Sequence, residues 1–146
     1  MNIRPLTPND YPRITALWRQ SPGMGLNNLD DSPEGIARYL QRNPSTCFAA
    51  EEEGELVGVI LSGHDGRRAF IYHLAVAGPY RRQGIGKALV EAALAALRAE
   101  GIHKAALVVM ANNPAGNAFW EQLGFTTRQD LVYRNRELDE MLRYDS

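Results

Sequence analysis

The stretch LAVAGPYRRQGIGKALVEAAL, residues 74–94, decides how the rest of the sequence is interpreted. A short apolar segment, predicted to be a strand, leads into a loop rich in arginine and glycine, and a helix is predicted to begin at Gly84. A helix N-terminus exposes unpaired backbone N–H groups and carries partial positive charge. Two glycines leave that backbone uncovered and three cations lie beside it: Gly84, Gly86, Arg81, Arg82 and Lys87. The pattern predicts an anion site suited to phosphate or pyrophosphate.

Two familiar phosphate motifs do not fit this stretch. A P-loop needs a glycine where Arg81 stands and a hydroxyl residue where Ala88 stands. The dinucleotide-binding fingerprint needs a third glycine at the position of Leu89. A capped helix with a solvated basic turn is the alternative that makes no use of a ligand.

Composition limits the classes of protein that the chain can belong to. Its 146 residues are 45% apolar with a net charge of −1, which predicts one globular domain over residues 1–146. Near-neutrality disfavours a nucleic-acid partner bound by bulk charge. Cys47 has no partner for a disulfide within the chain and is expected to be a buried, inert thiol. No apolar run is long enough to cross a membrane, so we expect a cytoplasmic protein.

Apolar periodicity, capping residues and turn residues predict the order β-α-α-β-β-β-α-β-α-β, an α/β domain with a mixed sheet. Strands are expected over residues 2–6, 46–52, 56–63, 69–76, 104–111 and 131–137. Helices are expected to begin at Pro8, Pro33, Gly84 and Pro114. The nearly all-apolar strand over residues 104–111 is expected in the middle of the sheet, covered on both faces.

Two blocks of the sequence resemble those of a known superfamily. Arg81-x-x-Gly84-x-Gly86, after the strand over residues 74–76, resembles the acyl-CoA-binding signature of the GNAT acetyltransferases. The block NPAGNAFWEQLGF, residues 113–125, is similar to the next motif of that superfamily. The resemblance implies a single-domain GNAT-like α/β fold, with a mixed central sheet of about six to seven strands flanked by about four helices.

The resemblance also implies an activity. It is transfer of an acetyl group from acetyl-CoA to a primary amine, on a small molecule or a peptide, by direct attack in a ternary complex. The alternative is a CoA-binding regulatory or partner-binding module with little turnover. Neither interpretation involves nucleic acid or a membrane, and both are compatible with a homodimer.

By the same resemblance, one set of residues is expected to bind the cofactor. Backbone N–H groups of residues 82–88 would cradle the pyrophosphate, and the backbone of residues 74–76 would pair with the pantetheine arm. Asn113 and Asn117 would face the cofactor, although Asn113 is also a good N-cap. The full cofactor-binding set is Leu74, Ala75, Val76, Arg81, Arg82, Gln83, Gly84, Ile85, Gly86, Lys87, Ala88, Asn113, Asn117 and Trp120.

The catalytic candidates depart from the family pattern at one position. Many members have a tyrosine where Trp120 stands, and an indole cannot protonate a thiolate. His73, Trp120 and Tyr133 are the catalytic candidates, with Tyr72 as a further candidate acid. His73 would take the proton of the amine, and strand alternation places it on the face opposite Tyr72. The backbone N–H of Ala75 or Val76 would stabilise the oxyanion.

Other polar groups have competing interpretations. Ser62, His64 and Asp65 suggest a hydrolase, but alternation turns Asp65 away and no nucleophile elbow surrounds Ser62. The three histidines lack metal-ligand spacing, so no metal site is expected. Asp30 and Asp31 would attract a cationic acceptor or favour the helix that follows them. Arg67 and Arg68 would bind a carboxylate on the acceptor or form a solvated turn, so the acceptor stays open.

Overall fold

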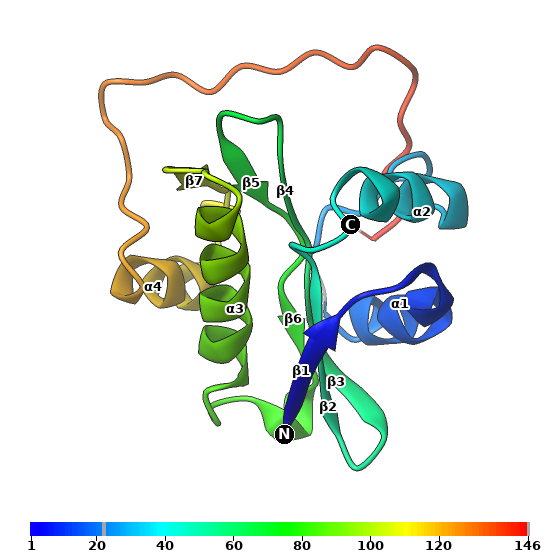
Figure 1. Cartoon of the computed structure of the whole chain (residues 1–146). Coiled ribbons are helices and arrows are strands. Elements are labelled where there is room, and N and C mark those ends of the chain that lie inside the picture. The colour runs from blue at the N-terminus through cyan, green and yellow to red at the C-terminus, as the bar shows by residue number, and fades with distance from the viewer. Residues whose placement is uncertain (22, 146) are drawn as a thin grey trace.

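The computed structural model describes residues 1–21 and 23–145 (Figure 1). Its strands are β1 (Asn2–Pro5), β2 (Phe48–Glu52), β3 (Glu55–Ile60), β4 (Ser62–His64), β5 (Ala69–Ile71), β6 (Ala75–Val76) and β7 (Ala105–Ala106). Its α-helices are α1 (Tyr11–Arg19), α2 (Pro33–Arg42), α3 (Ile85–Ala99) and α4 (Pro114–Gln122). Two short 3-10 helices, η1 (Pro8–Asp10) and η2 (Gly78–Tyr80), precede α1 and follow β6.

The strands form two hydrogen-bonded groups. One is an antiparallel sheet in the order β1-β2-β3-β6, and the other has the order β4-β5-β7 with β5 and β7 parallel. Along the chain, β3 continues into β4, and β5 leads into β6. One long hairpin therefore belongs to both groups, and the sheet divides along it. The mixed α/β fold expected from the sequence is confirmed.

Turn chemistry sets the register of the first hairpin. Glu52 pairs with Glu55, and the two residues between them, Glu53 and Gly54, have φ values of 50° and 80°. Two consecutive positive φ values are what a tight two-residue hairpin turn requires. The predicted hairpin at this acidic turn is confirmed.

The capping residues begin and end the helices where the sequence predicts. The Ser32 hydroxyl accepts a hydrogen bond from the Gly35 N–H at 3.0 Å at the start of α2. Gly84 caps α3 and Gly101 follows its end, both with φ of 84°. The first predicted helix differs, because Pro8 opens the 3-10 helix η1 before α1. No helix in residues 1–21 or 23–145 is long and apolar enough to cross a membrane.

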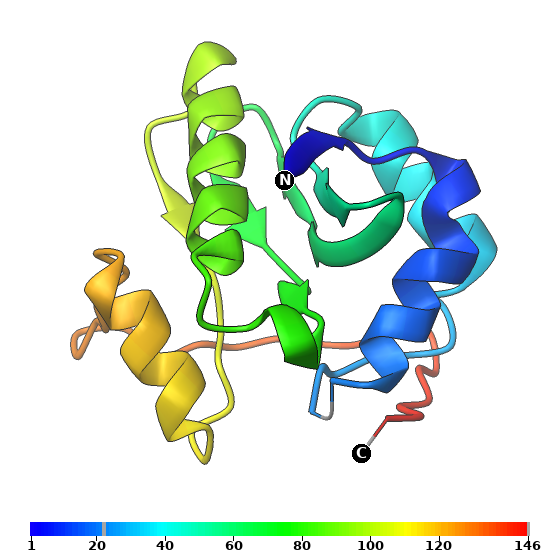
Figure 2. The same ribbon diagram turned by 90° about the horizontal axis from the view of Figure 1, so that it is seen from below.

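Helices cover the two faces of the strands and create two apolar cores, with α1 and α2 on one side and α3 and α4 on the other (Figure 2). On the α1–α2 face the core includes Ile14, Leu17, Trp18, Ile36 and Leu40. On the α3 face it includes Ile60, Ile71, Ile85, Leu89 and Val90. The predicted apolar faces of α1 and α3 are therefore the buried ones.

Cys47 lies inside the first core and is 1% exposed. Burial raises the pKa of its thiol to about 12, so the thiolate is not formed near neutral pH. The expected buried, inert thiol is confirmed.

The predicted strand over residues 131–137 is wrong. These residues form no strand and are exposed, with Val132 at 75% and Tyr133 at 65%. The strand over 104–111 is also shorter than predicted and lies at the edge of its group, leaving Val108 and Met110 exposed. A strand needs a hydrogen-bonding neighbour, and β7 pairs only with β5 before the chain leaves that group.

A charged network ties β1 to the start of α1. The Asp10 carboxylate is 3% exposed and accepts hydrogen bonds from Arg4 at 2.8 Å and Arg13 at 2.6 Å. Arg4 also bonds Glu51 on β2 at 3.0 Å. The Arg4 guanidinium, against the opposing effect of burial and together with the Thr7 N–H and Arg13, holds the pKa of Asp10 well below its usual range.

Replacing Asp10 by Asn should lower the free energy of unfolding by about 2–4 kcal/mol at pH 7, because two cations lose a buried partner. The stabilisation is present above the ordinary aspartate pKa of about 4 and is lost as pH falls through the lowered pKa of the folded state. Urea denaturation of Asp10→Asn as a function of pH measures both effects. Asp130→Asn, which breaks only the exposed pair with Arg128, is the matched control. An equal loss of stability in the two variants would contradict this account.

Candidate functional site

A β-bulge lies where the long hairpin divides. The Tyr72 N–H donates to the Leu61 carbonyl at 2.8 Å, and further along the same hairpin Ala75 pairs with Val59. Two residues, His73 and Leu74, therefore stand opposite the single residue Ile60. An extra residue in one strand bends it and re-aims its side chains.

The bulge corrects the predicted orientation of His73. Simple alternation places His73 opposite Tyr72, but both rings pack toward α1 and α2. His73 contacts Trp18 of α1 edge-on at a centroid distance of 5.0 Å, and Tyr72 contacts Tyr39 of α2 at 5.8 Å. Leu74 packs instead in the core on the α3 face. The extra residue lets two successive side chains share one face.

His73 is held by a carboxylate from the loop between α1 and α2. The Nε2 atom of His73 lies 2.8 Å from Oδ1 of Asp31, whose side chain is 3% exposed. The other Asp31 oxygen accepts the Asn27 N–H at 2.8 Å, and the Asp31 carbonyl accepts the Tyr11 hydroxyl at 2.6 Å. Asp31 is thus occupied inside the protein and does not present its charge to an acceptor. Asp30 beside it is exposed.

The backbone of β6 has one edge free of β3. The Ala77 N–H donates to the Val57 carbonyl of β3 at 2.8 Å. Because successive N–H groups of a strand point to opposite edges, the Ala75 N–H also faces β3 and the Val76 N–H faces away from it. Among the described strands, no ladder joins β6 to β7 on that free edge. The divergence of β6 from β7 is visible in Figure 1.

The start of α3 lies close to β6 and exposes backbone N–H groups. Gly84 caps the helix without a side-chain bond, and Arg82 before it also has a positive φ of 62°. The N–H groups of residues 85–87 lie in the first turn, where a helix supplies no carbonyl partner. Ala88 is a correction to the predicted cradle, because its N–H donates to the Gly84 carbonyl at 3.0 Å.

Two side chains around this turn bond to the backbone of the loop and of β6, and two others are exposed. The Nε atom of Arg81 donates to the Val76 carbonyl at 3.0 Å, and Gln83 donates to the Pro79 carbonyl at 3.2 Å. Arg82 and Lys87 are exposed, and Lys87 is 3.9 Å from Glu91. Arg81 therefore fixes the loop on β6, while Arg82 and Lys87 place positive charge at the helix start.

Helix α4 packs beside α3 and holds the second sequence block. A Cβ added to Gly86 would lie 3.3 Å from the Phe119 ring, so this glycine also permits close helix packing. The Asn113 side chain caps α4 through the Gly116 N–H at 2.9 Å, which confirms its capping role. Asn117 donates to the carbonyls of Met110 and Asn113, at 3.1 and 2.9 Å. Both asparagine side chains therefore stabilise the turn that precedes α4.

The remaining catalytic candidates come from α4 and from the C-terminal segment. Trp120 packs edge-on against Phe119 and Phe125, each at a centroid distance of 5.1 Å, as a core residue would. Tyr133 stands on the exposed C-terminal segment. Burial, followed by the charge of Asp30 and by Tyr133, raises the pKa of Tyr72 above its ordinary value. The ring centroids of Tyr72 and His73 are 6.2 Å apart.

The hydrolase interpretation fails on geometry. The Ser62 hydroxyl is buried and donates to the Thr46 carbonyl. His64 bonds Glu100 at 2.7 Å, and Asp65 accepts the N–H groups of Arg67 and Arg68 at 2.8 Å. The loop of Arg67 and Arg68 is a solvated turn. Within the described residues, no group of three or more histidine, cysteine or acidic residues is placed to hold a metal ion.

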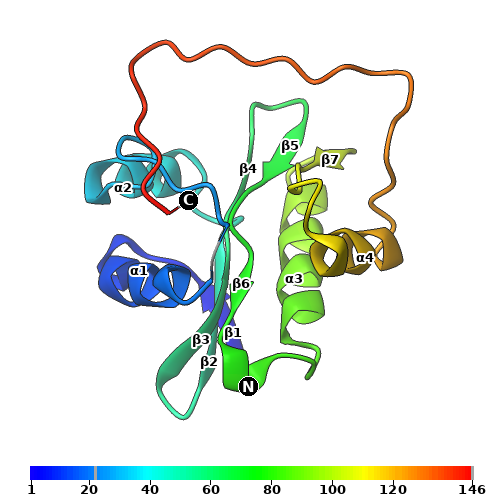
Figure 3. The same ribbon diagram turned by 180° about the vertical axis from the view of Figure 1, so that it is seen from behind.

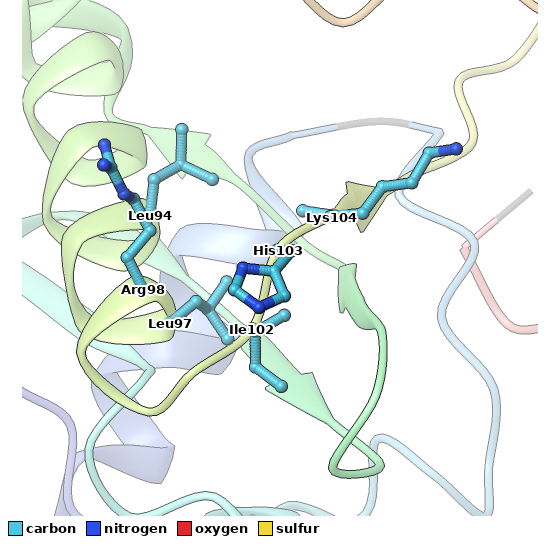
Figure 4. Close-up of a pocket in the computed structure, with 7 residues that line it drawn as sticks. Leu94, Leu97, Arg98, Ile102, His103 and Lys104 are labelled. Carbon is cyan, nitrogen blue, oxygen red and sulfur yellow. The ribbon is translucent and has the colours of Figure 1, made fainter.

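Two hollows lie away from β6 and the start of α3. Figure 4 shows one of about 650 Å³ at the C-terminal end of α3, with Leu94, Leu97, Arg98, Ile102, His103 and Lys104 in its wall. That end is roughly 22 Å from Gly84 along a helix of 15 residues. The other, about 640 Å³, lies between the start of α2 and the C-terminal segment and is lined by Asp30, Glu34, Arg38, Arg136, Glu137 and Asp139, among others. Only the second is built from the segment that carries Asp31.

The bond between Asp31 and His73 could not be predicted from the sequence. The two residues are 42 positions apart, and the sequence alone predicts for Asp31 either an acceptor contact or a charge that favours the following helix. The available signal was an Asp-Asp pair directly before a cap in a polar loop. That signal does not indicate which carboxylate turns inward.

Comparisons with known proteins agree with this arrangement. The sequence model of the acetyltransferase (GNAT) family matches residues 12–125. An acetyltransferase of Sodalis glossinidius is 31% identical over 144 residues, covering 99% of this chain and 100% of the relative.

Two solved structures share the fold. PaiA N-acetyltransferase from Thermoplasma acidophilum, in complex with coenzyme A, has a TM-score of 0.76 at 22% identity, covering 87% of this chain and 90% of that chain. AAC(6')-Iy, in complex with the bisubstrate analogue CoA-S-monomethyl-acetylneamine, has a TM-score of 0.69 at 19% identity, covering 92% and 97%. The comparisons give no support to a module without turnover. The chain belongs to the GNAT acetyltransferase family and is an N-acetyltransferase with acetyl-CoA as the acetyl donor.

Proposed function

We propose that the chain transfers the acetyl group directly from acetyl-CoA to a primary amine while both are bound. The observation that supports this most strongly is the bulge at His73 and Leu74. It turns an imidazole toward the α1–α2 face, two residues before the strand whose Val76 N–H points to a free edge. A proton acceptor at His73 and an oxyanion donor at Val76 thus lie three residues apart on the same arm of the hairpin.

The residues at the start of α3 fit the CoA pyrophosphate. The first-turn N–H groups of residues 85–87 and the charges of Arg82 and Lys87 supply donors and positive charge to an anion. Gly84 has open space where a Cβ would stand, so a ligand can approach the backbone. Residues 74–76 would pair with the pantetheine arm through the free edge of β6. Asn113, Asn117 and Trp120 support this binding site through the turn and the packing of α4.

The Val76 N–H is the donor that we assign to the thioester carbonyl oxygen. Negative charge develops on that oxygen as the amine attacks, and a fixed N–H lowers the barrier. Loss of one such donor typically costs about 100- to 1000-fold in rate. The Ala75 N–H is the other candidate, but we do not assign it this role because it faces β3.

His73 is the base that we assign to the amine. Asp31 binds Nε2, which favours the tautomer with its proton on Nε2 and leaves Nδ1 to accept the proton of the amine. As the carbon–nitrogen bond forms and the carbon–sulfur bond breaks, the thiolate needs a proton. Tyr72 beside His73 keeps its proton at neutral pH, as an ordinary tyrosine does, and burial and the nearby Asp30 raise its pKa further. It is the acid that we assign, in place of Trp120 and Tyr133.

The acceptor would enter from the α1–α2 side. The hollow beside α2 has a volume of about 640 Å³, within the usual range for small-molecule sites. Its wall carries both carboxylates and arginines, which suits an amine that bears further charged groups. The bisubstrate analogue bound by AAC(6')-Iy shows in that protein an amine acceptor joined to CoA. A small-molecule or peptide amine is the acceptor class that we propose, and the free Cys47 thiol suits a cytoplasmic location.

Gly84→Glu should weaken acetyl-CoA binding more than tenfold, about 1.4 kcal/mol or more, because a carboxylate would repel the pyrophosphate. Gly101→Glu is the matched control, since both glycines flank α3, have φ of 84° and face open space. Both variants should lose a similar amount of stability, about 1–2 kcal/mol, from the left-handed backbone. Isothermal titration calorimetry measures the affinity. Equal affinity of the two variants for acetyl-CoA would show that the cradle is elsewhere.

His73→Ala should lower kcat by roughly 100-fold or more on any amine that the wild-type chain acetylates, because the attacking amine loses its base. Acetyl-CoA affinity should stay unchanged, because the imidazole does not face the cradle. A panel of amino acids, polyamines and peptides, assayed by CoA release, supplies the acceptor. His103→Ala, at an exposed histidine beyond α3, is the control. Wild-type activity of His73→Ala would rule out this base.

A further inference from the structure

We infer that the C-terminal tail, residues 142–145, holds the loop that carries Asp31 in the position where it orients His73. Asp145 is then a positioning residue for acetyl transfer, although it lies 114 positions beyond Asp31 and touches neither His73 nor the cofactor cradle. This inference rests on the proposed role of His73. Figure 3 shows the red C-terminal segment running beside the loop that joins α1 to α2.

The Asp145 carboxylate anchors the tail on this loop. Its two oxygens accept the N–H groups of Gly25 at 2.9 Å and Leu26 at 2.8 Å, and its side chain is only 14% exposed. Hydrogen bonds from Arg143 and from these two N–H groups outweigh burial and lower the pKa of Asp145. The carboxylate is therefore ionised at neutral pH, as a strong acceptor of two backbone donors.

Backbone bonds continue the contact along the loop. The Asn28 N–H donates to the Leu142 carbonyl at 3.0 Å, and the Leu142 N–H donates to the Asn28 side chain at 2.6 Å. The Tyr144 N–H donates to the Leu26 carbonyl at 3.2 Å. Residues 26–28 are thus bonded along their length to the tail.

The same loop segment holds the Asp31 carboxylate. Asn27, between the two anchored residues, donates its N–H to Oδ2 of Asp31 at 2.8 Å, and Oδ1 of Asp31 bonds His73 at 2.8 Å. Burial, followed by the charge of Asp31 and by Tyr11, raises the pKa of Tyr144 above its ordinary value. A shift of the loop would move the Asn27 N–H and, with it, the carboxylate that fixes the imidazole.

These bonds hold the tail in place, because the segment before it is exposed and is not part of a helix or a strand. Residues 126–140 are exposed and form no helix or strand. Loss of the Asp145 carboxylate would remove two of the hydrogen bonds between the tail and the loop, while leaving the strands and the start of α3 in place.

The test is steady-state kinetics of the full chain carrying Asp145→Ala. We expect kcat to fall roughly tenfold or more, since misplacement of a catalytic group by about 1 Å has effects of this size. The KM for acetyl-CoA should be unchanged, and the acid limb of the pH profile should shift as it does in Asp31→Asn. Asp145→Asn, which keeps one acceptor oxygen, should recover part of the rate. Arg143→Ala removes only the outer partner of Asp145, at 3.1 Å, and should behave as wild type.

A double-mutant cycle separates positioning from general destabilisation. If Asp145 acts through Asp31, Asp31→Asn combined with Asp145→Ala should lose little more activity than Asp31→Asn alone. The ring 15N signals of His73 should move in Asp145→Ala and stay in place in Arg143→Ala. Additive losses, or an unchanged kcat and pH profile in Asp145→Ala, would overturn the inference about the tail. Full activity of His73→Ala would instead overturn the base assignment, whatever Asp145→Ala does.

Discussion

One extra residue in one strand is the constraint on which the site depends. Because His73 and Leu74 stand opposite Ile60 alone, the hairpin changes register between Tyr72 and Ala75. The change has two consequences on opposite sides of the strand. First, His73 turns toward α1 and Asp31. Second, the sheet divides at this place, so that β6 pairs with β3 whereas β5 pairs with β7. Without the bulge, alternation would turn His73 away from Tyr72 and from the loop that holds it.

The anion site beside the bulge shows why the net charge of the chain was a poor guide to its ligand. A formal charge of −1 disfavours a nucleic acid, yet it is compatible with a binding site for one pyrophosphate. The start of α3 gathers backbone donors with Arg82 and Lys87, whereas the hollow beside α2 has four carboxylates and two arginines in its wall. The anionic donor of the proposed reaction thus meets positive charge, and the amine acceptor meets a wall in which carboxylates outnumber arginines.

The local features of the fold could be predicted from the sequence because they depend on neighbours along the chain. The αL cap at Gly84, the Ser32 cap and the turn at Glu53 and Gly54 each follow from residue chemistry at one place. Features set by distant partners could not. The orientation of His73 depends on a register change, and the role of Asp31 depends on a residue 42 positions away. The segment over residues 131–137 has strand-like composition but finds no pairing edge in the structure.

In the proposed mechanism, the bulge leaves the Val76 N–H free to bind the reacting carbonyl, while the N–H groups of residues 85–87 hold the cofactor. The most direct measurement is a crystal structure of the chain with acetyl-CoA bound. We predict the thioester carbonyl oxygen at about 2.7–3.1 Å from the Val76 nitrogen, with the pyrophosphate on the N–H groups of residues 85–87. A cofactor bound elsewhere, or a Val76 N–H bonded to β7 with no thioester beside it, would contradict the account.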